Sequence, residues 1–197
     1  MKKRIAFFDF DGTITTRDTL LEIIKYCKGN TRFYLGFLVN APFLVAYKAG
    51  IISNQAAKEK ILSYFFKGLS LTAFQQHCEA FAAARLPLLL RPKALREIEK
   101  LAAAGTDIVV VSASAENWIA TWCRQNNIRL MGTLLESSRG LLTGRIQGRN
   151  CHGREKVNRI NAHVDLSQYD EIYCYGDTKG DKPMLELATF SFYKPFR

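Results

Sequence analysis

The sequence offers little of what disulfide-stabilised or zinc-binding proteins are built from. Its five cysteines are scattered without a CxxC pair, and the three histidines show no metal-ligand spacing near them. These residues are Cys27, Cys78, Cys123, Cys151 and Cys174, and His77, His152 and His163. We therefore predict reduced thiols in a reducing compartment. With 197 residues, 48% of them hydrophobic, the chain can fold around a buried core without cross-links.

Long apolar segments of the kind that direct secretion or cross a membrane are also scarce in the sequence. The opening MKKRIAFFDFDG is basic, but its apolar run is brief and is broken by Asp9 and Asp11. The most apolar stretch, residues 33–47, is interrupted by Asn40 and Pro42 and is shorter than the roughly 20 residues of a membrane-spanning helix. We predict a cytoplasmic protein. Three interpretations of residues 33–47 stay open, which are the core of a helical subdomain, a helix pair against the inner face of the membrane, and a true span.

Acidic residues are scarce beside basic ones. The 18 Asp and Glu against 28 Lys and Arg give a formal net charge of +10, which favours phosphorylated small molecules, an anionic membrane surface or nucleic acid as partners. Nucleic acid is the weakest of these, because the basic residues are dispersed and no base-stacking motif or known binding fold is present. A charged surface that only keeps the protein in solution explains the excess equally well.

Four short apolar runs are typical of buried strands. They are residues 4–9, 107–111, 171–175 and 190–193. A helical stretch from Pro92 to Ala104, ended by Gly105, precedes the second run and indicates a βαβ unit. We therefore predict an α/β fold with a Rossmann-like parallel sheet sandwiched by helices.

Two other segments differ from this pattern. Residues 129–147 predict a β-hairpin around a turn at 136–140. Residues 18–85 show helical periodicity and almost no strand pattern, which predicts an inserted α-helical cap subdomain over the strand ends. The expected division is a catalytic core of residues 1–17 and 86–197 and a cap of residues 18–85.

The first apolar run ends in the segment DFDGT, which contains Asp9, Asp11 and Gly12. Two carboxylates two residues apart at a strand end project on the same side, close enough to share a divalent cation, and the glycine allows a tight turn. One carboxylate can attack phosphorus while the other moves a proton to and from the leaving oxygen. By itself the segment also fits an ordinary acidic turn.

Three later segments place polar residues at the ends of predicted elements. Ser112 follows the second strand, with Ser114 as the expected cap of the next helix. Lys156 lies in CHGREKV, and Asp177 and Asp181 lie in GDTKGD after the third strand. Each segment alone also has an ordinary structural interpretation. Ser112 fits a helix cap, Lys156 fits a solvated lysine, and GDTKGD fits a β-turn. Their occurrence in this order at predicted element ends favours one shared site.

The four segments together resemble the motifs of the haloacid dehalogenase superfamily. DFDGT after an apolar strand resembles the first motif, and CHGREKV resembles the segment that supplies the lysine in phosphoserine-phosphatase-like members. The resemblance covers residues 1–17 and 86–197 and implies a magnesium-dependent phosphatase with a helical cap.

The resemblance also implies a role for each residue. Asp9 is the expected nucleophile, which forms an aspartyl-phosphate, and Asp11 is the expected acid and base. The implied Mg²⁺ ligands are the Asp9 carboxylate, the Asp11 main-chain carbonyl and Asp177, with Asp181 supporting them. The groups expected to bind phosphate are main-chain N–H groups near Gly12 and Ala113, the Ser112 hydroxyl and Lys156.

The substrate stays open at this stage. Phosphoserine phosphatases carry a Glu nine residues after the nucleophile, where this chain has the shorter Asp18 as a candidate substrate-selecting residue. The apolar stretch 33–47 and the basic charge resemble the bacterial phosphatidylglycerophosphatase branch, which implies a phosphorylated lipid. Phosphoserine or another small phosphate ester is the alternative, and a non-catalytic protein on the same fold is a further one.

Overall fold

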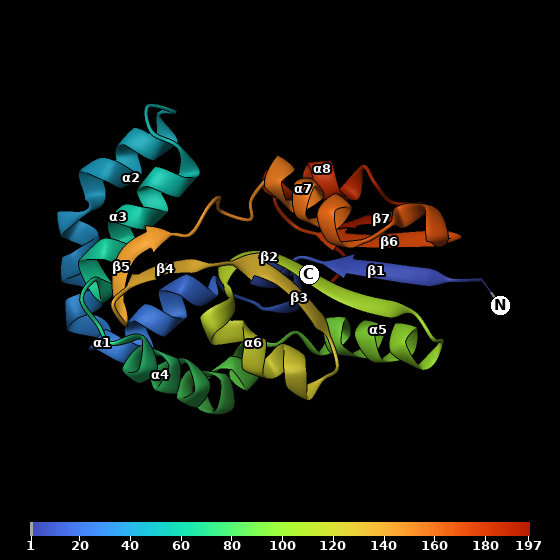
Figure 1. Cartoon of the computed structure of the whole chain (residues 1–197), viewed down its shortest axis with the longest axis horizontal. Coiled ribbons are helices and arrows are strands. Elements are labelled where there is room, and N and C mark those ends of the chain that lie inside the picture. The colour runs from blue at the N-terminus through green and yellow to red at the C-terminus, as the bar shows by residue number, and fades with distance from the viewer. Residues whose placement is uncertain (1) are drawn as a thin grey trace.

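The computed structural model describes residues 2–197, and a five-stranded parallel sheet lies at its centre (Figure 1). The strand order is β3-β2-β1-β6-β7, and every neighbouring pair is parallel. The strands are β1 (Arg4–Phe8), β2 (Asp107–Ala115), β3 (Arg129–Thr133), β6 (Glu171–Gly176) and β7 (Phe190–Tyr193). The predicted α/β fold with a Rossmann-like parallel sheet is confirmed.

Helices cover both faces of the sheet, because successive side chains of a buried strand point to opposite sides. Ile5 and Phe7 of β1 pack in one apolar cluster with α7 (Arg154–His163) and α8 (Lys182–Leu185). Phe8 packs in the other cluster with α5 (Pro92–Ala103) and α6 (Glu116–Gln125). This buried strand, apolar on both faces, explains the uninterrupted run in the sequence.

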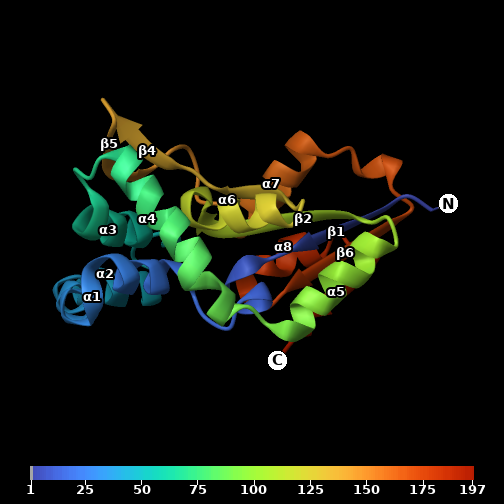
Figure 2. The ribbon, with the colours of Figure 1, turned by 90° about the horizontal axis from the view of Figure 1, so that it is seen from below.

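Four helices occupy the predicted cap region. They are α1 (Thr19–Val39), α2 (Ala41–Lys48), α3 (Asn54–Phe66) and α4 (Leu71–Ala84). They lie at the end of the molecule beyond the carboxyl ends of the strands, opposite the N-terminal end (Figures 1 and 2). Ile23, Phe65 and Phe81 belong to the same apolar cluster as Phe8, so their packing is continuous with the sheet. The division at residues 17/18 and 85/86 stays a prediction.

Residues 33–47 are shared between α1 and α2. The two helices meet at Asn40, whose side-chain amide donates to the Gly36 carbonyl at 2.8 Å. Within α1 the backbone is also interrupted at Gly29, where φ is +76°. No helix within residues 2–197 has the length and apolar character that a bilayer crossing requires. Cap core and membrane contact of residues 33–47 stay predictions.

The predicted hairpin of residues 129–147 is wrong in its first part. β3 pairs in parallel with β2 in the main sheet, and the hairpin consists only of β4 (Leu135–Ser138) and β5 (Leu141–Ile146). Its turn lies at Arg139 and Gly140, both with positive φ. The crossover helix α6 returns the chain beside β2, and a local apolar pattern does not distinguish that parallel pairing from an antiparallel one.

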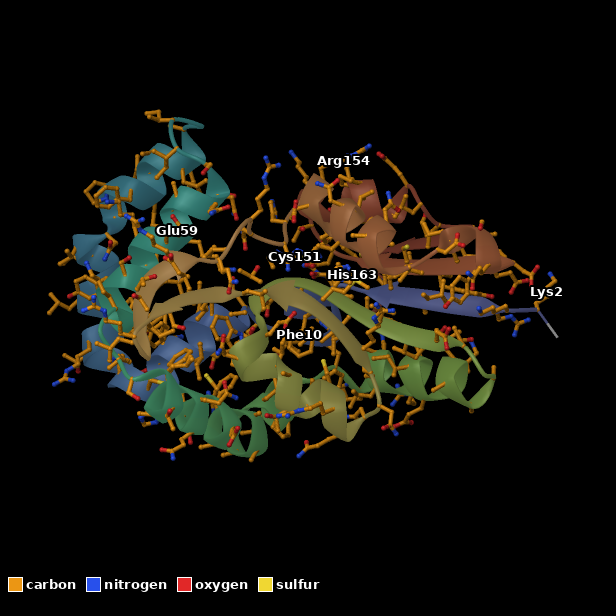
Figure 3. The ribbon with its side chains drawn as sticks, viewed as in Figure 1. Lys2, Phe10, Glu59, Cys151, Arg154 and His163 are labelled. Carbon is orange, nitrogen blue, oxygen red and sulfur yellow. The ribbon has the colours of Figure 1, made fainter. Side chains whose placement is uncertain are left out.

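The hairpin packs on α3, although it lies in the range predicted as core. Glu59 of α3, labelled in Figure 3, accepts from the Ile146 main-chain N–H at 3.0 Å. The Ser63 hydroxyl donates to the Gly144 carbonyl at 3.1 Å. A Cβ on Gly144 would lie 2.4 Å from the Ser63 Cα, so this contact requires glycine.

Gly144 and Gly140 form a matched pair that tests the hairpin packing. Both have positive φ, +79° and +77°, but a Cβ on Gly140 would meet nothing within 4 Å. Alanine at either position costs about 1–2 kcal/mol for the left-handed backbone. We expect Gly144→Ala to lower the free energy of unfolding in urea by about 1–3 kcal/mol more than Gly140→Ala, because of overpacking. Equal losses in the two variants would contradict the packing.

Candidate active site

The carboxyl ends of β1, β2 and β6 meet at one edge of the sheet, where open α/β folds place their ligands. Asp9 directly follows β1 and continues the ladder, since its N–H donates to the Tyr175 carbonyl at 2.9 Å. Asp177 directly follows β6, and Ser114 lies near the end of β2. All three line a cavity of about 640 Å³ between this edge and the helices α1–α3.

Lys156 connects two of the buried carboxylates. It projects from the first turn of α7, and its Nζ lies 2.5 Å from Asp9 Oδ1 and 2.7 Å from Asp181 Oδ1. Its side chain is only 1% exposed. Burial by itself lowers the pKa of Lys156, but the charges of Asp9 and Asp181 outweigh that effect and raise the pKa above its ordinary value.

The two carboxylates respond differently to this environment. Burial raises the pKa of Asp9 to about 7, although Lys156 opposes the shift. Burial also favours the neutral form of Asp181, but Lys156 and the N–H and hydroxyl groups of Thr178 hold the pKa of Asp181 below its ordinary value. Asp181 therefore stays charged, while Asp9 is poised between its two protonation states.

Both carboxylate oxygens of Asp181 accept hydrogen bonds within the protein. Of the three clustered acids, Asp9 and Asp177 are therefore the ones able to bind a ligand. Asp181 Oδ2 accepts from the N–H groups of Asp177 and Thr178, at 3.2 and 2.9 Å, and from the Thr178 hydroxyl at 2.7 Å. Carboxylate oxygens of Asp9, Asp177 and Asp181 lie within 4.8 Å of one another. The Thr13 hydroxyl lies 3.3 Å from both Asp9 Oδ2 and Asp177 Oδ1.

Gly12 allows the loop after β1 to pass close to Asp177. Its φ is +81°, and a Cβ there would lie 2.5 Å from Asp177 Oδ2. Asp9 Oδ2 and Asp177 Oδ1 are hard oxygen donors of the kind that Mg²⁺ and Ca²⁺ prefer. The donor set fits such a cation, with Asp9 and Asp177 as the residues able to hold it. The Asp11 main-chain carbonyl stays a predicted ligand.

Asp11 lines the same cavity, but its side chain turns toward α1. Its Oδ1 accepts from the N–H and the hydroxyl of Thr19, at 2.8 and 2.7 Å, and its Oδ2 accepts from the Ser114 hydroxyl. The indole N–H of Trp118 donates to the Thr19 hydroxyl at 3.0 Å. The predicted helix-cap role of Ser114 is wrong, because α6 begins at Glu116 after Ala115 and the Ser114 hydroxyl is used by Asp11.

Ser112 and Ala113 occupy different positions relative to the cavity. Ser112 is fully buried, its hydroxyl accepts from the Ser114 N–H at 3.0 Å, and it is not among the residues that line the cavity. Ala113 does line it, with a carbonyl that accepts from Lys58 Nζ at 2.5 Å. The phosphate-binding roles of both residues stay predictions.

Asp18 lies at the mouth of the cavity and caps α1. Its Oδ1 accepts from the N–H groups of Leu20 and Leu21, at 2.9 and 3.3 Å. Desolvation among the cavity walls and the charge of Asp11 raise the pKa of Asp18. Since the side chain keeps contact with solvent, water weakens both effects. The Asp18 carboxylate therefore has a structural role as a cap, and its predicted substrate-selecting role stays a prediction.

Lys58 and Arg197 also reach the site, although the sequence does not predict either as a site residue. Lys58 projects from α3 into the cavity, where desolvation lowers its pKa and the charges of Asp11 and Asp18 oppose that shift. Arg197 pairs with Asp177 Oδ2. No local motif marks either residue, because Lys58 lies in an ordinary helical segment and Arg197 lies outside the four motifs. Thr13 is different, because it lies inside DFDGT and could have been included.

Comparison with known proteins identifies related chains. Residues 6–186 match the model of the haloacid dehalogenase-like hydrolase family. The protein CicA of Caulobacter vibrioides is 34% identical over 98% of this chain and 86% of its own length. A histidinol-phosphatase of Neisseria meningitidis is 26% identical over 95% of this chain and 88% of its own length.

Solved structures share the fold. A protein of unknown function from Bordetella pertussis superimposes with a TM-score of 0.83 at 24% identity, covering 97% of this chain and 89% of its own. A substrate-bound phosphoserine phosphatase superimposes with a TM-score of 0.66 at 19% identity, covering 98% of this chain and 86% of its own. These similarities agree with the predicted phosphoserine-phosphatase-like fold.

The variant Lys156→Met tests the charge balance of the site. It leaves Asp9 and Asp181 buried without their partner, so we expect the free energy of unfolding in urea to fall by about 3–5 kcal/mol near pH 8. Without Lys156 the pKa of both acids rises, and protonation then removes the uncompensated charge. The loss should therefore be smaller near pH 5.

Lys100→Met provides the control, because Lys100 forms an exposed ion pair with Glu97. We expect it to change the unfolding free energy little at either pH. A loss in Lys156→Met that is the same near pH 5 and near pH 8 would contradict the proposed balance of charges.

Proposed function

We propose that this chain, a phosphatase that belongs to the haloacid dehalogenase-like hydrolase family, hydrolyses phosphomonoesters with Asp9 as the covalent nucleophile. The observation that carries this proposal is the contact of Lys156 with Asp9 inside a cavity that Asp11 and Asp177 also line. Three separate segments thus meet in one place, and they supply the attacking carboxylate with a second acid, a positive charge and a further carboxylate.

Asp9 performs the attack in this proposal. One of its oxygens forms a bond to phosphorus in line with the breaking ester bond, while Asp11 donates a proton to the leaving oxygen. A water molecule then attacks the phosphorus of the aspartyl-phosphate, and Asp11 takes a proton from that water. Inorganic phosphate leaves, and the free Asp9 carboxylate is regenerated. Lys156 and main-chain N–H groups at Gly12 and Ala113 stabilise the phosphoryl oxygens.

We propose Mg²⁺ as the cofactor, held by Asp9 and Asp177. Their accessible oxygens face the same Thr13 hydroxyl, and Asp181 holds the loop that carries Asp177 through its bond to the Asp177 N–H. When bound, the ion supplies positive charge that offsets the repulsion between the attacking carboxylate and the phosphate.

The proposed nucleophile is tested by Asp9→Asn, which preserves size and removes the attacking oxygen. We expect phosphate release from para-nitrophenyl phosphate to fall by at least roughly 10³-fold with an unchanged circular dichroism spectrum. Asp11→Asn should lose about 10²–10⁴-fold. Asp165→Asn, at an exposed turn outside the cavity, is the control. Substantial activity in a folded Asp9→Asn variant rules out the covalent route.

The proposed metal site is tested by thermal unfolding with Mg²⁺ and with a chelator. Mg²⁺ should raise the melting temperature, because it binds the folded state and relieves repulsion between Asp9 and Asp177. Since the pKa of Asp9 is about 7, Asp9 must lose a proton to bind the ion at lower pH. The rise should therefore be smaller near pH 5.5 than near pH 8.

Asp177→Asn is the matched control and should largely abolish the rise. If this variant and the unchanged protein show the same rise, the ion binds elsewhere. If the rise is equal at the two pH values, Asp9 is not one of the ligands.

For the substrate we propose a phosphate ester with an apolar group, such as phosphatidylglycerophosphate. The helices α1, α2 and α3 line the cavity with Asn54, Lys58 and a set of apolar residues that we call the apolar wall. Its residues are Leu20, Leu21, Phe37, Leu44, Tyr47, Ala57 and Ile61. A second candidate is a small zwitterionic phosphomonoester, because Asp18 and Lys58 place opposite charges at the same cavity.

A phosphate-release screen over lipid phosphates, amino-acid phosphates, sugar phosphates and nucleotides distinguishes these substrates. We expect a higher kcat/KM for the lipid phosphate than for its water-soluble headgroup. Leu44→Ser should remove most of that difference without lowering headgroup turnover, because it changes only the apolar wall. Equal turnover of headgroup and lipid eliminates the lipid hypothesis, and a clear preference for an amino-acid phosphate favours the second candidate.

A further inference from the structure

The segment from α1 to the turn after α2 exposes an unusual number of large apolar side chains. Leu38, Val45 and Ile51 expose 73%, 66% and 77% of their surface, and α2 contains no buried residue. We call the whole set the apolar face. It consists of Tyr34, Leu35, Leu38, Val39, Val45 and Ile51, all of them exposed. Scattered exposed apolar residues are ordinary, whereas a gathered set marks an interaction surface.

The segment that carries the apolar face has only one sign of charge. Residues 23–58 contain no Asp or Glu and five basic residues, of which Lys58 points into the cavity. The others are Lys25, Lys28, Arg32 and Lys48. An apolar helix face bordered by cations is complementary to a surface that is both apolar and anionic.

A shallow basic groove borders this face. Lys28 and Arg32 line it together with Leu35 of the apolar face and the aromatic residues Tyr64 and Phe65 of α3, and its volume is about 360 Å³. A groove lined by two cations together with aromatic and aliphatic side chains can hold an anionic headgroup while the neighbouring apolar residues enter the acyl region.

The position of the face relates it to the catalytic cavity. α1 and α2 lie at the end of the molecule farthest from the N-terminal end of the sheet (Figures 1 and 2). Phe37, Leu44 and Tyr47 of the same two helices line the cavity. The helices that present the apolar face outward therefore also form the apolar wall over the proposed nucleophile.

We propose that the apolar face docks the protein on an anionic lipid bilayer without crossing it. The helices lie in the plane of the interface, with Lys28 and Arg32 at the headgroups and Leu38 and Val45 below them. This arrangement brings the cavity of the proposed function to the membrane. Docking is measured without any substrate, so either proposal can fail while the other stands.

A second copy of the chain is a poorer occupant of this face. A symmetric dimer through the apolar face would place two such segments against each other, and residues 23–58 offer no acidic group to pair with the cations. A bilayer containing phosphatidylglycerol supplies the negative charge that the segment lacks.

Vesicle co-sedimentation tests the proposal. The probes are phosphatidylcholine vesicles with and without about one-third phosphatidylglycerol, a fraction that gives a strongly negative surface. The face variant is Leu38→Asp with Val45→Asp, two residues that do not line the cavity. The control is Leu88→Asp, because Leu88 is 71% exposed but lies between α4 and α5, outside the face.

We expect binding to the anionic vesicles that weakens with salt, and little binding to pure phosphatidylcholine. The face variant should bind on the order of tenfold or more weakly, because it loses apolar burial and adds repulsion. Leu88→Asp should bind like the unchanged protein, and hydrolysis of para-nitrophenyl phosphate should be equal in all three.

Three results overturn the proposal. They are no binding to anionic vesicles, an equal loss of binding in Leu88→Asp, and a concentration-dependent dimer that the face variant abolishes while vesicle binding is unaffected. The last result assigns the face to a second copy instead. An unchanged circular dichroism spectrum in all three proteins shows that a loss of binding does not come from unfolding.

Discussion

The site depends on one shared ammonium group. Asp9, Asp177 and Asp181 are all buried at the same sheet edge, and like charges at this separation repel strongly where the dielectric is low. Lys156 offsets two of them at once with contacts of 2.5 and 2.7 Å. Removing the ammonium group would leave uncompensated buried charge. Because α7 carries Lys156, the stability of the site depends on the position of α7 as well as on the strand ends.

A second constraint joins the sheet edge to the start of α1. Asp11 accepts from Thr19, the first residue of that helix, and from Ser114 of β2, while Trp118 holds the Thr19 hydroxyl. The proposed acid is thereby fixed by groups from β2, α1 and α6 at once. If α1 moves relative to the sheet, either these hydrogen bonds break or the Asp11 side chain moves with the helix. The orientation of Asp11 and the position of the helical region are therefore coupled.

Much of this arrangement could be predicted from local patterns in the sequence. The apolar run before Asp9 and the run before Asp177 indicate parallel strands, and parallel strands bring their carboxyl ends to one edge, so the approach of these acids follows from topology. Lys156 could be placed only through its motif, since its helix has no feature that aims it inward. The hairpin boundary and Lys58 depended on packing between distant segments, which apolar periodicity does not encode.

The account rests on the Asp9 carboxylate as the group that accepts the phosphoryl group from the substrate. Rapid acid quenching within the first turnover measures this directly. Peptide mass spectrometry of the quenched protein should find a phosphoryl group on Asp9 and on no other residue. The account would be contradicted if product forms in the same samples while Asp9 stays unmodified, whether another residue carries the phosphoryl group or none does.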